Sequence, residues 1–156
     1  MKRQMMALLT VGCVLLGTTM VVLNVRAPIA DAHCQVPCGI YDDAARVTRM
    51  KEDATTIEKA ITNINQLAGQ HDSQAFNQAA RWVVTKEEHA SHIIEVISQY
   101  FMAQRVKPVA PGADGYDAYV GALTKYHAVM VAAMKTKQQS NQAAADALKS
   151  AIAALP

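Results

Sequence analysis

The stretch "DDAARVTRMKEDATTIEKAITNINQLA", residues 42–68, carries the pattern that decides the fold class. Its apolar side chains recur at spacings of three and four residues, which places them along one face of an α-helix. These positions are Val47, Met50, Ala54, Ile57, Ile61, Ile64 and Leu67. Asp42 and Asp43 suit the start of a helix and Gly69 suits its end, so the sequence predicts a helix over about 42–68 with one apolar stripe.

Three further helices are predicted downstream, over about 73–105, 116–137 and 141–154, with Ser73 as the N-cap of the first of them. Their expected inward positions are Phe76, Ala80, Val83, Ala90, Ile94, Ile97 and Phe101, then Tyr119, Leu123, Tyr126, Met130 and Met134, then Ala144, Leu148 and Ile152. The segment VAPGADG, residues 109–115, has turn chemistry and is predicted to be a loop. Short connections favour antiparallel neighbours, so the predicted fold is all-α, an antiparallel up-down four-helix bundle over 42–156.

The first 32 residues have the composition of a leader peptide. A basic start precedes the apolar run MMALLTVGCVLLGTTMVVL at 5–23, and small residues flank the acid in ADA at 30–32. We therefore expect a leader peptidase to cut after Ala32 and the mature chain to be periplasmic or extracellular. The apolar run is also long enough to span a bilayer, so an uncleaved membrane anchor is the alternative.

The net charge and the cysteine content limit the classes of function that the chain can have. The net charge of +2 belongs to the full chain. The leader carries more basic than acidic residues, and its loss leaves a nearly neutral domain without a basic stripe, which makes nucleic acid an unsuitable partner. Two cysteines, Cys34 and Cys38, remain after cleavage. In an exported protein such a pair ordinarily forms a disulfide, which is one interpretation of the stretch that holds them.

The stretch HCQVPCGIY, residues 33–41, offers a second interpretation, a metal-binding hook. Cleavage before His33 would free its α-amine beside its imidazole. Together with the amide nitrogen and thiolate of Cys34 and the thiolate of Cys38, these groups form a nitrogen and sulfur donor set. A planar set of this kind favours Ni(II) or Cu(II), whereas zinc prefers a tetrahedron with four side-chain ligands.

Two residues let the chain turn so that the second thiolate can return to the first. Pro37 fixes its own φ and lacks an amide donor, and Gly39 permits positive φ. From these residues alone, a catalytic metal centre, a non-catalytic metal carrier and a disulfide-closed loop all stay open.

The motif His-Cys-x-x-Pro-Cys-Gly-x-Tyr, placed after a processing site and before a four-helix domain, resembles the nickel-dependent superoxide dismutases. The positions that carry the resemblance are His33, Cys34, Pro37, Cys38, Gly39, Tyr41 and Asp42. Weaker similarity extends through Lys86-Glu87 and from Tyr100 to Pro108. The resemblance implies dismutation of superoxide to dioxygen and hydrogen peroxide, with one nickel ion per chain cycling between Ni(II) and Ni(III), in a homohexamer.

The same resemblance implies a role for each hook residue. His33 would bind nickel through its amine and ring, Cys34 through its amide nitrogen and thiolate, and Cys38 through its thiolate. The catalytic residues would be His33, as the axial ligand, and Tyr41, which would gate the open face of the metal.

The sequence departs from the family pattern around the axial histidine. Gln35 stands where an Asp is expected, Thr48 where a Glu is expected and His89 where an Arg is expected. His89 is therefore the candidate partner of the axial ring. His92, three residues on, suggests a weaker hypothesis, a minor metal site with Glu88. His71 and His127 are expected to be surface residues, and the absence of a repeated Glu-x-x-His pattern disfavours a di-iron bundle.

Overall fold

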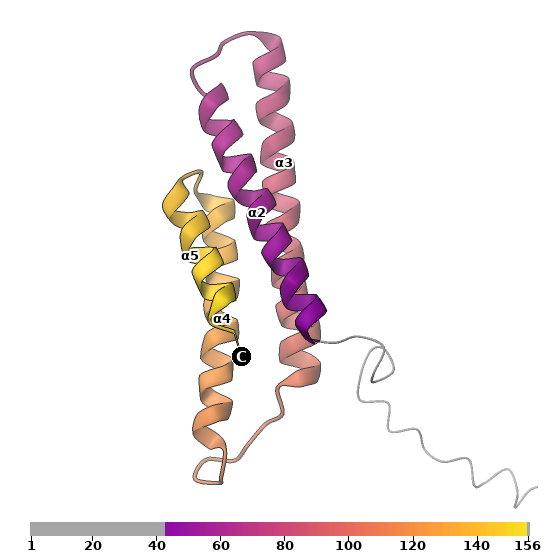
Figure 1. The fold of residues 1–156 in the computed structure, drawn as a ribbon, viewed down its shortest axis with the longest axis vertical. Coiled ribbons are helices and arrows are strands. Elements are labelled where there is room, and N and C mark those ends of the chain that lie inside the picture. Colours follow the sequence, from indigo (N-terminus) through magenta and orange to yellow (C-terminus); the bar gives the residue numbers. More distant parts are fainter. Residues whose placement is uncertain (1–42, 156) are drawn as a thin grey trace, which may run out of the picture. The chain divides into compact units, whose positions relative to one another are not determined.

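A computed structural model describes residues 43–155, so the predictions for the leader at 1–32 and the hook at 33–41 lie outside the described residues. Between residues 43 and 155 the chain is helical and contains no strand (Figure 1). The elements are α2 (Asp43–Leu67), α3 (Ser73–Glu95), η1 (Val96–Arg105), α4 (Tyr116–Gln138) and α5 (Gln142–Ala153). The predicted all-α up-down four-helix bundle is confirmed, because η1 continues α3. None of these helices is long and apolar enough to cross a membrane.

Side-chain caps fix two helix starts. The carboxylate of Asp72 accepts a hydrogen bond of 2.8 Å from the amide of Ala75, so the N-cap of α3 is Asp72 rather than the predicted Ser73. The side-chain oxygen of Asn141 accepts from the amide of Ala144 at 2.9 Å and caps α5. Each bond satisfies one of the amides that a helix start leaves without a partner.

The core lies between α2 and α3 on one side and α4 and α5 on the other. Most predicted inward positions of α2 and all of those in α5 are buried. The structure corrects five positions. Ile93 is fully buried where Ile94 was expected, and Met134 is exposed because the buried face of α4 runs through Val129, Ala133 and Thr136. The other three lie on the first part of α3, where Phe76 is 78% exposed and Ala80 and Val83 are exposed as well.

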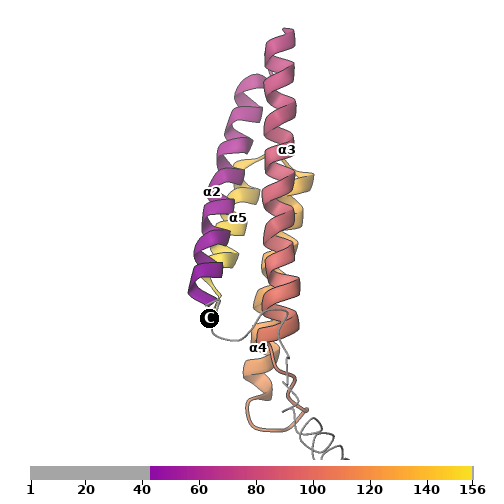
Figure 2. The same cartoon turned by 90° about the vertical axis from the view of Figure 1, so that its right-hand side faces the viewer.

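Phe76 is exposed because the α2–α3 hairpin extends past the ends of α4 and α5 (Figures 1 and 2). Two contacts mark the end of the part of the hairpin that α4 and α5 cover. On α3, the Lys86 ammonium donates to the carbonyls of Thr136 and Lys137, at the end of α4, over 2.6 and 2.7 Å. On α2, Glu58 accepts hydrogen bonds from two side chains of α5. We call residues 60–85, beyond these contacts, the arm.

The helix predicted over 73–105 has the expected length but two registers. It is α-helical to Glu95 and a π-helix from Val96 to Arg105, where the amide of Val106 bonds to the carbonyl of Phe101 at 2.9 Å. Phe101 packs in the core, with its ring stacked on Tyr126 at a centroid distance of 5.0 Å. The π segment ends the helix beside the start of α2, because Tyr100 and Arg105 both contact Asp43.

Candidate metal centre

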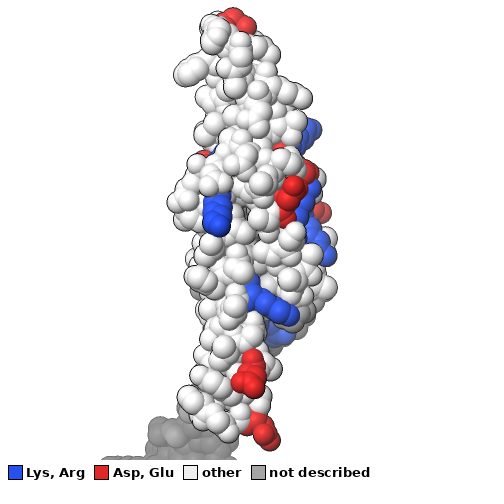
Figure 3. Space-filling model, turned by 90° about the vertical axis from the view of Figure 1, so that its left-hand side faces the viewer, with Lys and Arg blue, Asp and Glu red and all other residues white. Residues whose placement is uncertain are grey.

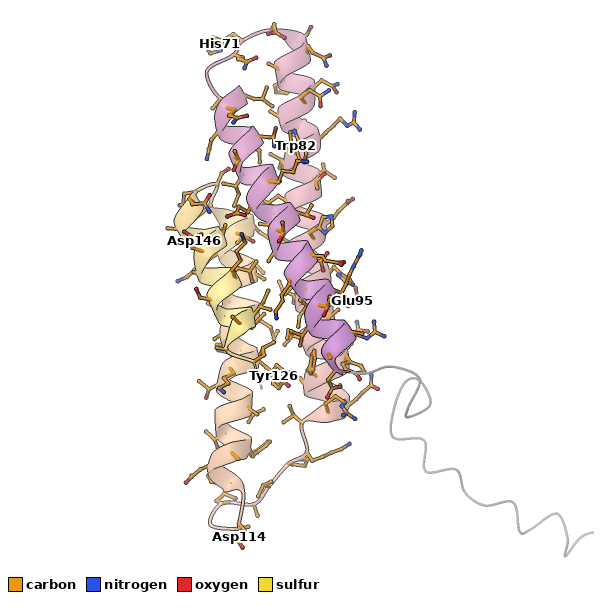
Figure 4. The ribbon with its side chains drawn as sticks, viewed as in Figure 1. His71, Trp82, Glu95, Asp114, Tyr126 and Asp146 are labelled. Carbon is orange, nitrogen blue, oxygen red and sulfur yellow. The ribbon has the colours of Figure 1, made fainter. Side chains whose placement is uncertain are left out.

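Most predicted site residues lie outside the described residues, namely His33, Cys34, Pro37, Cys38, Gly39 and Tyr41. The structure describes the surfaces that a hook could meet. Two polar clusters on α2, α3 and η1 have the chemistry to position it. Figure 4 places His71 in the turn between α2 and α3, at the tip of the hairpin. His71 and His127 are both exposed, as predicted.

The first cluster, which we call the anchor, is built on Asp43, the first residue of α2. Its carboxylate accepts a hydrogen bond of 2.8 Å from the Tyr100 hydroxyl and two bonds, of 3.1 and 3.0 Å, from the Arg105 guanidinium. The Arg46 guanidinium lies 5.3 Å from the centre of the Tyr100 ring, within cation–π range. The anchor therefore fixes the first turn of α2 against η1, two residues after the end of the predicted hook.

The pKa of the Tyr100 hydroxyl is raised above its usual value, first by burial and then by its hydrogen bond to the Asp43 carboxylate. The hydroxyl therefore stays protonated at neutral pH and can act as the donor in that bond.

The π register makes the anchor possible. Tyr100 and Arg105 are five residues apart, and an α-helix would separate them by about 140° around its axis. Hydrogen bonding between residues five apart aligns them in a row instead. Both side chains can then reach the same carboxylate of Asp43, at the distances of 2.8 and 3.0 Å given above.

The second cluster is centred on Asp53, which is only 1% exposed on α2. One carboxylate oxygen lies 2.6 Å from Nδ1 of His89, and the other lies 2.6 Å from Nδ1 of His92. Arg49 stands at the edge, 4.0 Å from the first oxygen. We call this the carboxylate–imidazole cluster. Together with Glu88 these residues line an open cavity of about 230 Å³.

The buried carboxylate of Asp53 determines which ring nitrogen of His89 and of His92 stays available to bind another group. Because Asp53 accepts from Nδ1 of each imidazole, each neutral ring carries its proton on Nδ1 and leaves the lone pair of Nε2 free of Asp53. A carboxylate behind a histidine is the usual device that fixes its tautomer and ring orientation near a metal. Both rings are partly exposed, so a further group can approach them.

The weaker hypothesis of a minor metal site at His92, His89 and Glu88 is wrong. Among residues 43–155 no group of three or more histidine, cysteine or acidic side chains is arranged to hold a metal ion. The imidazoles instead bond to Asp53, and Glu87, the neighbour of Glu88, pairs with Lys86 at 2.9 Å and lies 3.7 Å from Lys137.

Sequence reasoning missed Asp53, although one signal for it was present. Asp53 falls three residues after Met50 and four before Ile57, which puts an acid inside the apolar stripe of α2. An acid in such a position needs a partner on the facing helix, and α3 supplies His89 and His92. Thr48, the position where the family pattern expects a carboxylate, is exposed, so on this surface the buried carboxylate comes from Asp53 instead.

The comparison with protein families gives one match. The family model for nickel-containing superoxide dismutase matches residues 28–156, a range that includes the predicted hook and all four helices of the bundle. No curated protein and no solved structure matches the chain significantly.

Proposed function

The chain belongs to the nickel-containing superoxide dismutase family, and we propose that its catalytic centre is the hook at 33–41, freed by removal of the leader at 1–32. The enzyme is a nickel-containing oxidoreductase whose substrate is superoxide. The observation that carries the proposal is the family match, because it covers both the donor residues and the bundle that would support them.

The donor set fits nickel. The amine and imidazole of His33, the amide nitrogen and thiolate of Cys34 and the thiolate of Cys38 supply the nitrogen and sulfur ligands that suit Ni(II), one ion per chain. When bound, nickel supplies one-electron chemistry by alternating between Ni(II) and Ni(III). Two superoxide ions and two protons then give one dioxygen and one hydrogen peroxide.

We propose that the ring of His33 is positioned by His89, with Asp53 behind it. Ten residues from His33 to Asp43 can span at most about 33 Å. Asp43 and Asp53 are ten helical residues apart, or about 15 Å, so the hook is long enough to return along α2. The free Nε2 of His89 would accept the ring N–H of His33, while Asp53 holds His89 in the required tautomer.

Tyr41 is proposed to control access of superoxide to the hook. Tyr41 precedes Asp43 by two residues, and Tyr100 and Arg105 hold Asp43 in place. The position of Asp43 would therefore limit where Tyr41 can lie. Pro37 and Gly39 are proposed to shape the turn that brings the two thiolates together. Export to the periplasm or beyond, cleavage by a leader peptidase and assembly as a homohexamer complete the proposal.

The decisive experiment is intact mass with metal analysis on the protein exported by its native host. A chain that begins at His33, with one nickel and an activity lost on nickel removal, would support the proposal. A chain that begins at His33 with a Cys34–Cys38 disulfide and no nickel would replace it with a non-catalytic exported bundle. A retained leader would place the chain at the membrane and leave no free amine to bind the metal.

One substitution tests the ligand set directly. Cys38→Ser should bind no nickel and show no dismutase activity, because a hydroxyl is a poor ligand beside the remaining thiolate. Gln35→Ala is the matched control within the hook, since its side chain has no proposed role. Retention of stoichiometric nickel and full activity by Cys38→Ser would rule the hook out as the metal site.

A further inference from the structure

The carboxylate–imidazole cluster contains a second histidine, His92, which has no role in the proposed metal centre. Its Nδ1 lies 2.6 Å from one oxygen of Asp53, while Nδ1 of His89 lies 2.6 Å from the other oxygen. His89 and His92 are three residues apart on α3, so their side chains are neighbours on one face of the helix. The two rings therefore hold both oxygens of one buried carboxylate and fix the orientation of its plane.

A third group, the guanidinium of Arg49, approaches the same carboxylate. Its Nε lies 4.0 Å from the oxygen of Asp53 that His89 contacts, which is beyond hydrogen-bond distance. Arg49 is 58% exposed and its Nη1 lies 3.2 Å from Glu52. A charged donor forms a stronger hydrogen bond to a carboxylate than a neutral imidazole does. Arg49 and His89 are therefore competitors for one oxygen of Asp53, and His89 holds it in this structure.

The cluster lies below the arm, in the part of the bundle where charged side chains gather. On the face drawn in Figure 3, Lys, Arg, Asp and Glu side chains spread over the middle and lower parts of the molecule, and few lie at its upper end. Within the arm only Asp72 and Arg81 are acidic or basic, apart from His71. A carboxylate in the charged part can gain a new partner when it turns, so its orientation depends on the groups that hold it.

We propose that His92 is a positioning residue, which keeps Asp53 turned towards His89 and away from Arg49. Because Asp53 accepts from Nδ1 of His89, the neutral ring of His89 presents a bare Nε2. If the carboxylate turned to Arg49, the proton of His89 would no longer be held on Nδ1 and could move to Nε2. A protonated Nε2 donates a hydrogen bond and cannot accept one. His92 thereby sets the direction of the hydrogen bond that His89 can make.

The consequence for the reaction passes through the axial ligand. His89 can accept the ring N–H of His33 only while its own Nε2 is bare. His92 acts on the metal centre only through this contact, so its effect on catalysis rests on the proposed function. The tautomer of His89 itself depends on residues 49–92 alone and can be measured without the metal.

The test compares two substitutions of similar size at position 92. The side-chain amide of Asn can place its nitrogen where Nδ1 of the ring lies, whereas that of Gln reaches the position of Nε2. His92→Asn therefore keeps the donor to Asp53 and His92→Gln removes it. Nitrogen NMR of the exported protein, with its nickel removed and in alkaline solution where imidazole is neutral, reports which nitrogen of His89 carries the proton. His89→Gln identifies the signal.

The wild type and His92→Asn should both show the proton of His89 on Nδ1, and His92→Gln should lose most of that signal. Combining Arg49→Met with His92→Gln should restore it, because the competing donor is gone. His127→Gln is the matched control, since His127 is an exposed histidine on α4, and it should leave His89 unchanged. Helical circular dichroism should be the same for every variant.

Three results would overturn the role of His92. His92→Gln could keep the wild-type signal of His89, His92→Asn could lose as much of it as His92→Gln does, or removal of Arg49 could restore none of it.

A second measurement separates this role from the proposed function. With nickel bound, His92→Gln should lower dismutase activity and His92→Asn should keep most of it. If the tautomer of His89 changes as expected while the activity of His92→Gln equals that of the wild type, the proposed contact between His89 and His33 is wrong. The role of His92 in holding Asp53 would then stand without an effect on catalysis.

Discussion

Substitution of Lys86 by methionine should destabilise the bundle by about 3 kcal/mol. The ammonium of this 3% exposed side chain makes hydrogen bonds of 2.6 Å to the carbonyl of Thr136, 2.7 Å to that of Lys137 and 2.9 Å to the carboxylate of Glu87. Hydrogen bonds to a charged group contribute about 1.5–3 kcal/mol each. Relief of the cost of burying the ammonium offsets part of the loss. The rest of the lost stability comes from the two carbonyls at the end of α4, which are left without a hydrogen-bond donor. A positive charge at this end of the helix is also favoured by the helix dipole.

Urea and thermal unfolding followed by helical circular dichroism would measure this loss. For a domain of this size, 3 kcal/mol corresponds to a fall in Tm of roughly 10 °C. Lys125→Met is the matched control, because Lys125 is an exposed lysine on α4. If Lys86→Met unfolds within about 0.5 kcal/mol of Lys125→Met, a difference typical of surface changes, then Lys86 does not hold the end of α4.

Three further predictions concern the site and the pH response. His89→Gln should retain nickel but lower dismutase activity, whereas His71→Gln should leave both unchanged. If the two variants have equal dismutase activity, His89 is excluded as a positioning residue. Tyr41→Phe should retain nickel and relax control of superoxide and peroxide access, which inhibition by added peroxide would reveal. The hydrogen bonds from Lys149 and Gln142 lower the pKa of Glu58. Glu58 therefore contributes stability above its ordinary pKa of about 4.3 and loses it as the pH falls through the lowered value. The difference in unfolding free energy between Glu58→Gln and the wild type should therefore shrink in acid, and a constant difference would contradict this assignment.

The sequence predicted the helices because the causes of a helix are local. The stripe of Met50, Ala54, Ile57 and Ile61 is buried as expected, and the loop at 109–115 is correctly placed. The exact helix ends could not be predicted in the same way. Asp72 and Ser73 are both good N-caps, and only the hydrogen bond from the amide of Ala75 to Asp72 distinguishes them.

Features that depend on other parts of the chain could not be predicted. Periodicity places Phe76 on the inner face of α3, but the lengths and positions of α4 and α5 decide whether another helix covers that face. In the sequence, Asp53 is one more acid on a charged helix. Its role depends on His89 and His92, which only the packing of α3 against α2 brings to it. The hook residues themselves lie outside the described residues, so their arrangement stays a prediction.

The π register of η1 makes the length of this segment as important as its composition. A π turn contains more residues than an α turn, so loss of one residue between 96 and 105 would let the segment return to α register. Tyr100 and Arg105 would then face different directions, and Asp43 would lose one of the two groups that hold it. We therefore expect related chains to tolerate substitutions in this segment more readily than deletions. A deletion there would loosen the start of α2, to which the proposed hook is attached, while leaving every proposed metal ligand in place.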